Sequence, residues 1–243
     1  MKPFVLISTR PEDETAEAEY ELFLRYGDLQ ESQLRWIRLE SEPLPEINLS
    51  EISGIMLGGS PFTGSIPREH KSDTQLRVEH ELSLLLDDVV DTDTPLLGTC
   101  YGVGTLGRHQ GATINFTYGE EIEAPLMRIT EAGLSDPLLA GIPREFRSFV
   151  GHKEACSQLP SHATLLVTSA ACPVQMFRIK KNLYGTQFHP ELDVPGIHLR
   201  IDVYKNSGYF PADEVLAVKE YTASFDVSAS NRIVRNFTER YGR

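Results

Sequence analysis

The first group that could do chemistry is a cysteine between two glycines, in the run Gly98-Thr99-Cys100-Tyr101-Gly102. A short apolar segment precedes this run and a helix is expected after it, so the thiol should lie at a sharp strand-to-helix turn. Nucleophile elbows use such turns to expose a side chain under backbone strain. The start of the helix should also favour thiolate over thiol. Free cysteine is commonly buried and inert, so Cys100 alone does not establish a nucleophile.

A second group, His189-Pro190-Glu191, directly follows the apolar run Leu183–Phe188. Ligands collect just past the carboxyl ends of strands in open α/β sheets. A cysteine nucleophile needs a base within hydrogen-bonding reach, and that base needs a third group to fix its tautomer. His189 and Glu191 supply both, whereas without the cysteine they would be interpreted as a polar surface turn. Together the two groups predict a Cys100, His189, Glu191 triad of nucleophile, base and orienting carboxylate.

Alternating strands and helices must position these groups. Apolar runs predict strands over Phe4–Ser8, Trp36–Leu39, Ile52–Leu57 and Pro95–Thr99. Helical spacing predicts one helix that ends near Gly27 and a second behind the capping-box signature of residues 72–75. Repeated β-α units of this kind predict an α/β fold with an open, mostly parallel sheet covered by helices on both faces.

The middle of the chain has a different pattern. Short β runs fill residues 113–188, including 164–167, 174–179 and 183–187, which predicts a strand-rich, antiparallel portion. Helical spacing returns in the tail, around Ile197 and again around Ile233. No low-complexity tract, long linker or repeat interrupts the sequence, so we expect a single domain over residues 1–243.

Composition excludes several classes of function. Apolar residues make up 40% of the chain, and no apolar run approaches the roughly 20 residues that cross a membrane. The first residues fit a core strand better than a signal peptide, and the three cysteines (Cys100, Cys156, Cys172) cannot all pair with one another, so we expect a reduced, cytoplasmic protein. A net charge of -12 without a basic stripe argues against a nucleic-acid partner.

With these motifs in place, the chain resembles the class I glutamine amidotransferases, especially stand-alone proteins similar to the amidotransferase domain of GMP synthetase. The resemblance covers roughly Ile52 to Glu191. In that family a G-x-C-x-G elbow carries the nucleophile, a strand ending in F-H-P-E carries base and orienting group, and an earlier Gly-Gly loop helps to build the oxyanion hole. Residues 98–102, 188–191 and Gly58-Gly59 match these motifs in the same order.

The resemblance implies a flavodoxin-like fold and an activity. Cys100 would attack the side-chain amide of glutamine, and backbone N–H groups near Gly59 and at Tyr101 would stabilise the oxyanion. Glutamate would leave through a γ-glutamyl thioester, and the ammonia would pass to an acceptor on a synthetase. The chain has no P-loop or other clear nucleotide motif, so transfer would require a separate synthetase subunit. No cofactor is expected.

Substrate contacts follow from the resemblance at four positions. Gly58 belongs to the Gly-Gly loop, and Gly104 stands where the family usually has Gln lining the substrate pocket. Gly151-His152 stands where many relatives have a Ser-His pair. The missing Gln puts strict glutamine selection in question, and the space it leaves makes a γ-glutamyl peptidase the alternative within the same chemistry.

Other interpretations come from other classes of function. Residues 102–107 form a G-x-G-x-x-G run, with Glu120 and Glu121 at the distance of a ribose-binding acid, which would suit a dinucleotide-dependent oxidoreductase. The run lies in mid-chain, however, and leaves Cys100 unexplained. A non-catalytic binding protein with this fold is a further alternative. His152, Cys156 and Cys172 lack the paired spacing of zinc sites, so no metal is expected.

Overall fold

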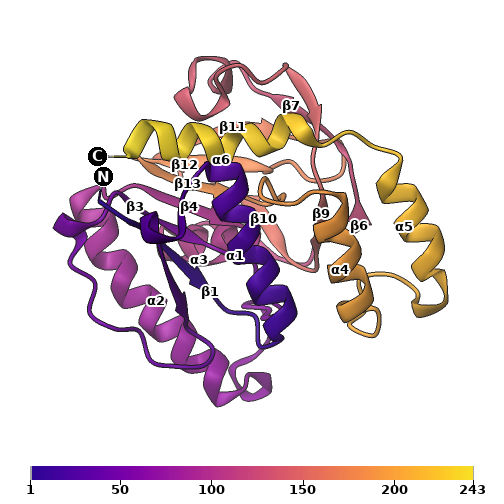
Figure 1. The fold of residues 1–243 in the computed structure, drawn as a ribbon, viewed down its shortest axis with the longest axis horizontal. Helices are drawn as coiled ribbons and strands as arrows, with labels where there is room; N and C mark the ends of the chain where they lie inside the picture. The colour runs from indigo at the N-terminus through magenta and orange to yellow at the C-terminus, as the bar shows by residue number, and fades with distance from the viewer. Residues whose placement is uncertain (1, 243) are drawn as a thin grey trace.

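The computed structural model describes residues 2–242, and a large mixed sheet runs through the middle of them (Figure 1). Its strand order is β2-β1-β3-β4-β13-β12-β11-β7-β8. The first five strands in this order are parallel: β2 (Leu34–Arg38), β1 (Phe4–Ser8), β3 (Gly54–Leu57), β4 (Leu96–Thr99) and β13 (Leu183–Thr186). The other four pair antiparallel: β12 (Met176–Ile179), β11 (Ala163–Thr168), β7 (Leu126–Ile129) and β8 (Glu145–Arg147). The predicted α/β class and the antiparallel portion are therefore confirmed.

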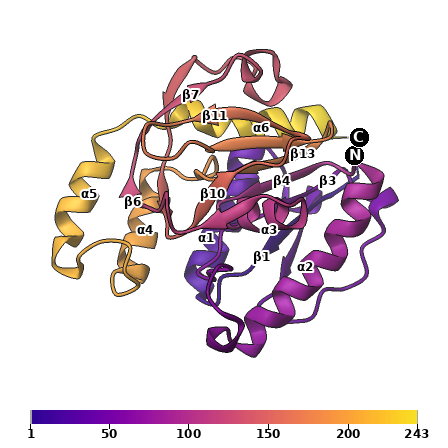
Figure 2. The same ribbon diagram turned by 180° about the vertical axis from the view of Figure 1, so that it is seen from behind.

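Helices cover both faces of the sheet, as Figures 1 and 2 show from opposite sides. One face carries α1 (Asp13–Gly27) and α6 (Ser228–Tyr241), and the other carries α2 (Asp73–Thr92) and α3 (Tyr101–His109). Two further helices, α4 (Val194–Tyr204) and α5 (Val215–Ala223), pack against each other beyond α1. The tail helices α4 and α6 were expected from spacing, whereas α5 was not.

Strand β1 shows why the sheet is buried on both sides. Phe4 and Leu6 point into the core beneath α1 and α6, while Val5 and Ile7 point into the core beneath α2. Successive side chains on a strand face opposite ways, so a strand between two helical layers must be apolar throughout. All five residues of β1 are buried accordingly.

Local signals set the helix ends. Ser72 caps α2 by accepting a hydrogen bond from the N–H of Gln75, as the capping-box signature predicted. The return bond of the box is absent between these described residues, because the Gln75 amide donates to the Thr63 carbonyl and to Glu79 instead. Helix α1 ends at Gly27 as predicted, with Asp28 rather than the glycine in the left-handed conformation.

Two small sheets complete the strand-rich portion. Strand β10 (Ala155–Gln158) pairs with β5 (Thr113–Asn115), and β6 (Glu120–Glu123) pairs with β9 (Val150–His152). Within residues 2–242, no helix combines the length and the apolar character needed to span a bilayer.

The parallel strands bring the candidate residues to one edge of the sheet. The carboxyl ends of β1, β3, β4 and β13 lie side by side, and the chain leaves them at residues 9–10, 58–59, 100 and 187–189. Polar groups that follow neighbouring parallel strands therefore meet above the same edge.

Candidate active site

Cys100 sits at a strained turn between β4 and α3. Its backbone has φ 51° and ψ -84°, a conformation that a side-chain-bearing residue adopts only when its surroundings enforce it. Its N–H donates to the Thr186 carbonyl at 2.6 Å, which ties the turn to β13. A Cβ on Gly98 would lie 2.8 Å from the Cα of Gly102, so glycine is required at this close approach. The predicted elbow is present.

His189 is oriented by Glu191. The imidazole Nδ1 lies 2.7 Å from Glu191 Oε1, and both side chains are almost fully buried. A carboxylate can only accept, so the Nδ1 position carries the hydrogen and Nε2 holds the lone pair of a base, which Arg200 Nη1 approaches to 3.4 Å. The backbone of His189 is fixed as well, because its N–H donates to the Phe149 carbonyl at 2.9 Å.

The thiol and the imidazole face one cavity. Cys100 and His189 line this cavity together with Arg10, Arg200, Tyr204 and other residues. Although both side chains are described, no hydrogen bond joins them, and the thiol contact that exists is Gln187 Nε2 at 4.0 Å from Sγ. Hydrogen bonds between catalytic groups are often long in free enzymes and tighten when substrate binds.

A buried ionic cluster borders the base. Glu19 Oε1 accepts from Arg10 Nε at 2.9 Å and from Arg200 Nη2 at 3.1 Å, and its other oxygen accepts from the Ser8 hydroxyl. Arg200 also reaches Glu191 at 3.1 Å and lies against the imidazole, with Nη1 2.9 Å from Nδ1. The cluster therefore joins α1, the end of β1 and α4 to the catalytic edge.

This environment favours different protonation states for His189 and Glu191, the base and its carboxylate. Burial lowers the pKa of His189, and Arg200 lowers it further against the attraction of Glu191. Burial would raise the pKa of Glu191, but His189 and Arg200 outweigh it and hold that pKa at about 2. At neutral pH the pair is therefore a neutral imidazole beside an ionised carboxylate, which is the state required of a base and its orienting group.

The thiol does not follow the sequence prediction. Burial raises the pKa of Cys100 to about 12, because desolvation outweighs the nearby charges of Arg10 and Arg200. This direction opposes the expectation that the start of α3 makes Cys100 a thiolate, and it favours the thiol as the resting form of the free protein. A base must remove its proton during attack.

The pH dependence of kcat/KM should reflect these two groups. A neutral base is needed, so activity should be lost as pH falls through the lowered pKa of His189, with a midpoint below 6.5. No alkaline loss is expected up to about pH 9, because the thiol stays protonated there. In Glu191→Gln the acid limb should move to lower pH, since the attraction that raises the pKa of His189 is removed. An acid limb centred above pH 6.5 in the wild type would contradict this assignment.

The two predicted oxyanion donors, the N–H groups of Tyr101 and Gly59, have different surroundings. Tyr101 begins α3, so its N–H belongs to the helix start, where no intrahelical acceptor exists. The N–H of Gly59 donates to Glu19 Oε1 at 3.2 Å, so in this structure it is engaged by the protein, and its role as an oxyanion donor stays a prediction. Glycine is required at position 58 because a Cβ there would overlap the Glu19 carboxylate. The sequence did not reveal that Glu19 occupies this space.

The other predicted substrate contacts surround a second cavity. The residues that line it include Cys100, Gly104, Gly151 and His152. Gly151 faces the first cavity as well. Both ring nitrogens of His152 have partners within the protein, the Glu154 carbonyl and the Glu120 carboxylate. The imidazole can therefore border a substrate, while each of its nitrogens faces an oxygen of the protein.

The dinucleotide interpretation is wrong. Gly102, Gly104 and Gly107 all lie inside α3, whereas the dinucleotide fingerprint needs its first glycines in the tight turn between the strand and the helix, where Cys100 stands instead. Gly107 is small for packing, because a Cβ there would lie 3.2 Å from the Ile114 side chain. Glu120, the candidate ribose ligand, is buried against His152.

Sequence reasoning missed the charged lining of the first cavity. Arg10 could have been found, because it follows β1 just as Cys100 follows β4 and so must lie at the same edge. Gln187, next to the F-H-P-E motif, could have been found in the same way. Glu19 and Arg200 lie within helices and belong to no motif, so only the fold brings them to the site.

One protein family matches most of the chain. The model of the "Glutamine amidotransferase class-I" family matches residues 21–195, which is more than half of the chain. The chain belongs to this family. The protein is accordingly an enzyme with glutamine-hydrolysis chemistry, and the family match begins well before the Ile52 at which the motif resemblance starts.

Proteins of similar sequence support the same family assignment. The chain is 28% identical over 180 residues to a protein of Thermococcus kodakarensis named as one subunit of a glutamine-hydrolyzing GMP synthase, covering 71% of this chain and 86% of that one. It is 27% identical over 151 residues to the glutamine-hydrolyzing GMP synthase of Neisseria meningitidis serogroup C, covering 62% of this chain but 26% of that longer protein. The amidotransferase is thus similar to a separate synthase subunit over most of the length of that subunit.

Solved structures confirm the fold. A glutamine amidotransferase from Thermotoga maritima superposes with a TM-score of 0.78 at 21% identity, over 99% of this chain and 98% of that one. A glutamine amidotransferase from Methylobacillus flagellatus gives a TM-score of 0.74 at 19% identity, over 99% and 94% of the two chains. The architecture of this amidotransferase is therefore shared along nearly its whole length.

Proposed function

We propose that this amidotransferase, acting as a single domain over residues 1–243, hydrolyses the side-chain amide of glutamine with Cys100 as nucleophile, His189 as base and Glu191 as orienting group. The observation that carries the proposal is the shared cavity, where a strained cysteine meets a neutral imidazole whose Nδ1 is held by an ionised carboxylate. This is the combination that thiol acyl transfer requires.

The proton movements follow from the resting thiol. His189 Nε2 takes the proton from Sγ as sulfur attacks the amide carbon, and the resulting oxyanion is stabilised by the N–H of Tyr101. The imidazolium then gives its proton to the leaving nitrogen, so ammonia departs and a γ-glutamyl thioester remains. Water, deprotonated by the same Nε2, attacks the thioester, and glutamate leaves as Cys100 recovers its proton.

The cavity also suits the amino acid end of the substrate. Arg10 and Arg200 both line it and are both buried, where they are ion-paired with Glu19 and, for Arg200, with Glu191. A guanidinium group matches a carboxylate in shape and charge. We propose that the two arginines attract the α-carboxylate of glutamine, while the backbone of Gly151 borders the same end.

The ammonia acceptor belongs to another chain. The relative from Thermococcus kodakarensis is named as one subunit of a glutamine-hydrolyzing GMP synthase, and the chain covers most of its length. We propose that the ammonia released at Cys100 passes to a separate synthetase subunit.

Ammonia release tests the proposed function. The purified chain incubated with glutamine should release ammonia and glutamate in equal amounts, and Cys100→Ser should not. A glutamine-like diazo-ketone should label Cys100, which is partly exposed, in preference to the buried Cys156 and Cys172. Glutamine should slow that labelling. Equal labelling of the three cysteines without protection by glutamine would remove Cys100 as the nucleophile.

A γ-glutamyl peptidase is the second candidate, and the second cavity favours it. Cys100 lines both cavities, so an acyl group in the first could place a bulky leaving amine in the second. Gly104 keeps that space open. The carboxylate of Glu154 faces it and is held by the N–H groups of Gly64 and Ser65.

Gly104→Gln separates the two candidates. A Cβ at this position would lie 3.2 Å from Glu154 Oε1 and 3.4 Å from Arg108 Nη1, so the Glu154 side chain must shift by a few tenths of an ångström to admit it. The added amide should lower the KM for glutamine and reduce turnover of γ-glutamyl peptides by about tenfold, because it fills the space for the leaving amine. Gly111→Gln, at an exposed position outside both cavities, is less suitable as a control because Gly111 has φ 87°.

The better control is Thr105→Gln, on the next residue of α3 and outside the second cavity. It should leave the ratio of the two activities unchanged. If Gly104→Gln also leaves that ratio unchanged while the protein stays folded, residue 104 does not border the substrate.

A further inference from the structure

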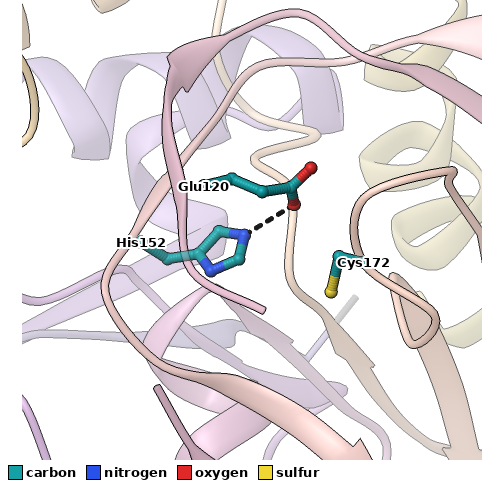
Figure 3. Close-up of side chains that lie close together, drawn as sticks. All are labelled: Glu120, His152 and Cys172. Carbon is teal, nitrogen blue, oxygen red and sulfur yellow. Dashed lines mark hydrogen bonds and ion pairs between the residues drawn. The ribbon is translucent and has the colours of Figure 1, made fainter. Parts of the chain in front are cut away.

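A buried trio of possible ligands lies next to the second cavity, outside the catalytic residues. Glu120 begins β6, His152 ends β9, and Cys172 lies in the connection between β11 and β12. One ligand atom from each lies within 4.8 Å of the others, and all three residues are buried. Figure 3 shows the three side chains facing one another. We propose that Glu120, His152 and Cys172 bind a zinc-type divalent metal ion.

The hydrogen bonds around His152 leave the correct nitrogen for a metal. Its Nδ1 lies 3.1 Å from the Glu154 carbonyl oxygen, which can only accept, so Nδ1 carries the hydrogen. Nε2 then points at Glu120 Oε2, 2.8 Å away. Metal-binding histidines commonly donate their second ring N–H to a backbone carbonyl in this way, which fixes the tautomer and the ring.

The carboxylate has an unused oxygen. Glu120 Oε2 lies 2.8 Å from His152 Nε2 and accepts from the amide of Gln175 at 2.7 Å, but Glu120 Oε1 has no hydrogen-bond partner among residues 2–242. The carbonyl oxygen of the Gln175 amide is likewise buried without a partner in this described part of the chain. A buried polar atom without a partner is costly, and a bound cation would remove that cost.

The donor set indicates the type of ion. Thiolate, imidazole and carboxylate are the three ligand types of zinc sites, whereas Mg²⁺ and Ca²⁺ take oxygen ligands. Two negative ligands and a neutral imidazole balance a divalent charge. Bonds of about 2.0 to 2.3 Å put the ligand atoms of a tetrahedral ion roughly 3.3 to 3.7 Å apart. The most distant pair therefore needs to close by on the order of 1 Å, while Nε2 and Glu120 Oε2, now 2.8 Å apart, need to open slightly, and a water can complete the tetrahedron.

The position of the site allows an ion to enter from the second cavity and to stabilise the wall of that cavity. His152 also lines the second cavity, so an ion can enter from there. The next residue along β9 is Gly151, which faces both cavities. An ion at this site would tie β6, β9 and the 169–174 connection together, and so would fix the wall opposite Cys100. The site itself does not depend on the proposed catalytic function, because its test measures binding.

The test is metal binding by the full chain in a Cys100→Ser background, which prevents the ion from being held at the catalytic thiol. After treatment with a chelator, the protein should bind one Zn²⁺ per chain in competition with a chromophoric chelator. With Co²⁺ as the probe, it should show a thiolate-to-cobalt charge-transfer band. Cys172→Ser should abolish the band and weaken Zn²⁺ binding by more than the roughly 100-fold that loss of an outer-shell group can cost.

The matched control is Cys156→Ser, which removes the other buried cysteine and should leave both readouts unchanged. Glu120→Gln keeps the shape of the side chain and should also weaken Zn²⁺ binding by at least about tenfold, which covers the case that Cys172→Ser does not fold. Failure of the Cys100→Ser protein to bind Zn²⁺, or a charge-transfer band that survives Cys172→Ser, would overturn the proposal.

Discussion

Cys100→Ala and His189→Ala should each lower glutamine turnover by about 10⁴-fold or more, because each removes a group that takes part directly in acyl or proton transfer. The double variant should be little worse than either single one, since the two side chains act as a unit and neither works without the other. Ammonia release under saturating glutamine measures the effect.

Glu191→Gln is the graded comparison. The amide keeps the shape of the side chain but cannot stabilise an imidazolium, so turnover should fall. The turnover that remains should be roughly ten- to a hundredfold higher than in Cys100→Ala or His189→Ala. Wild-type turnover in His189→Ala would show that the imidazole is not the base. Multiplied defects in the double variant would show that Cys100 and His189 act separately.

Glu19→Ala should cause a large loss of stability. It removes the carboxylate shared by Arg10, Arg200, the Ser8 hydroxyl and the Gly59 N–H, and leaves two buried guanidinium groups facing each other. Breaking a buried ionic group in this way costs about 3 to 5 kcal/mol in the free energy of unfolding. For a domain of this size, the melting temperature should drop by roughly 10 °C.

Glu17→Ala is the matched control, because Glu17 lies on the same helix but is exposed. It should change the free energy of unfolding by no more than about 0.5 kcal/mol. Denaturant titration of both variants measures the difference. If Glu19→Ala were as stable as Glu17→Ala, the two arginines would have other partners in solution, and the placement of Arg200 beside His189 would need revision.

Much of the fold could be predicted because its signals are local. The unbroken apolar run of β1 identifies a strand buried on both faces, and Ser72 fixes the start of α2 through its own hydrogen bond. The tail helices were visible in their spacing. Helix α5 was not, because most of its residues are exposed and it lacks a strong apolar face.

The candidate site divides in the same way. Cys100, His189 and Glu191 belong to compact motifs at strand ends, so residue type and order sufficed to predict that they meet. Their charge states did not follow from order. The helix start at Tyr101 suggested a thiolate, but the depth of burial, which is a property of the whole fold, raises the pKa of the thiol instead.

The sequence by itself determined which catalytic groups are present and at which edge of the sheet they meet, because strand polarity and motif order are local properties of the chain. Only the tertiary structure decided which charges surround that chemistry. Glu19 and Arg200 are 181 residues apart and in helices, yet their side chains meet beside the base. Glu120, His152 and Cys172 likewise come from three separate segments. Packing across distant elements creates such contacts, and no spacing along the chain encodes them.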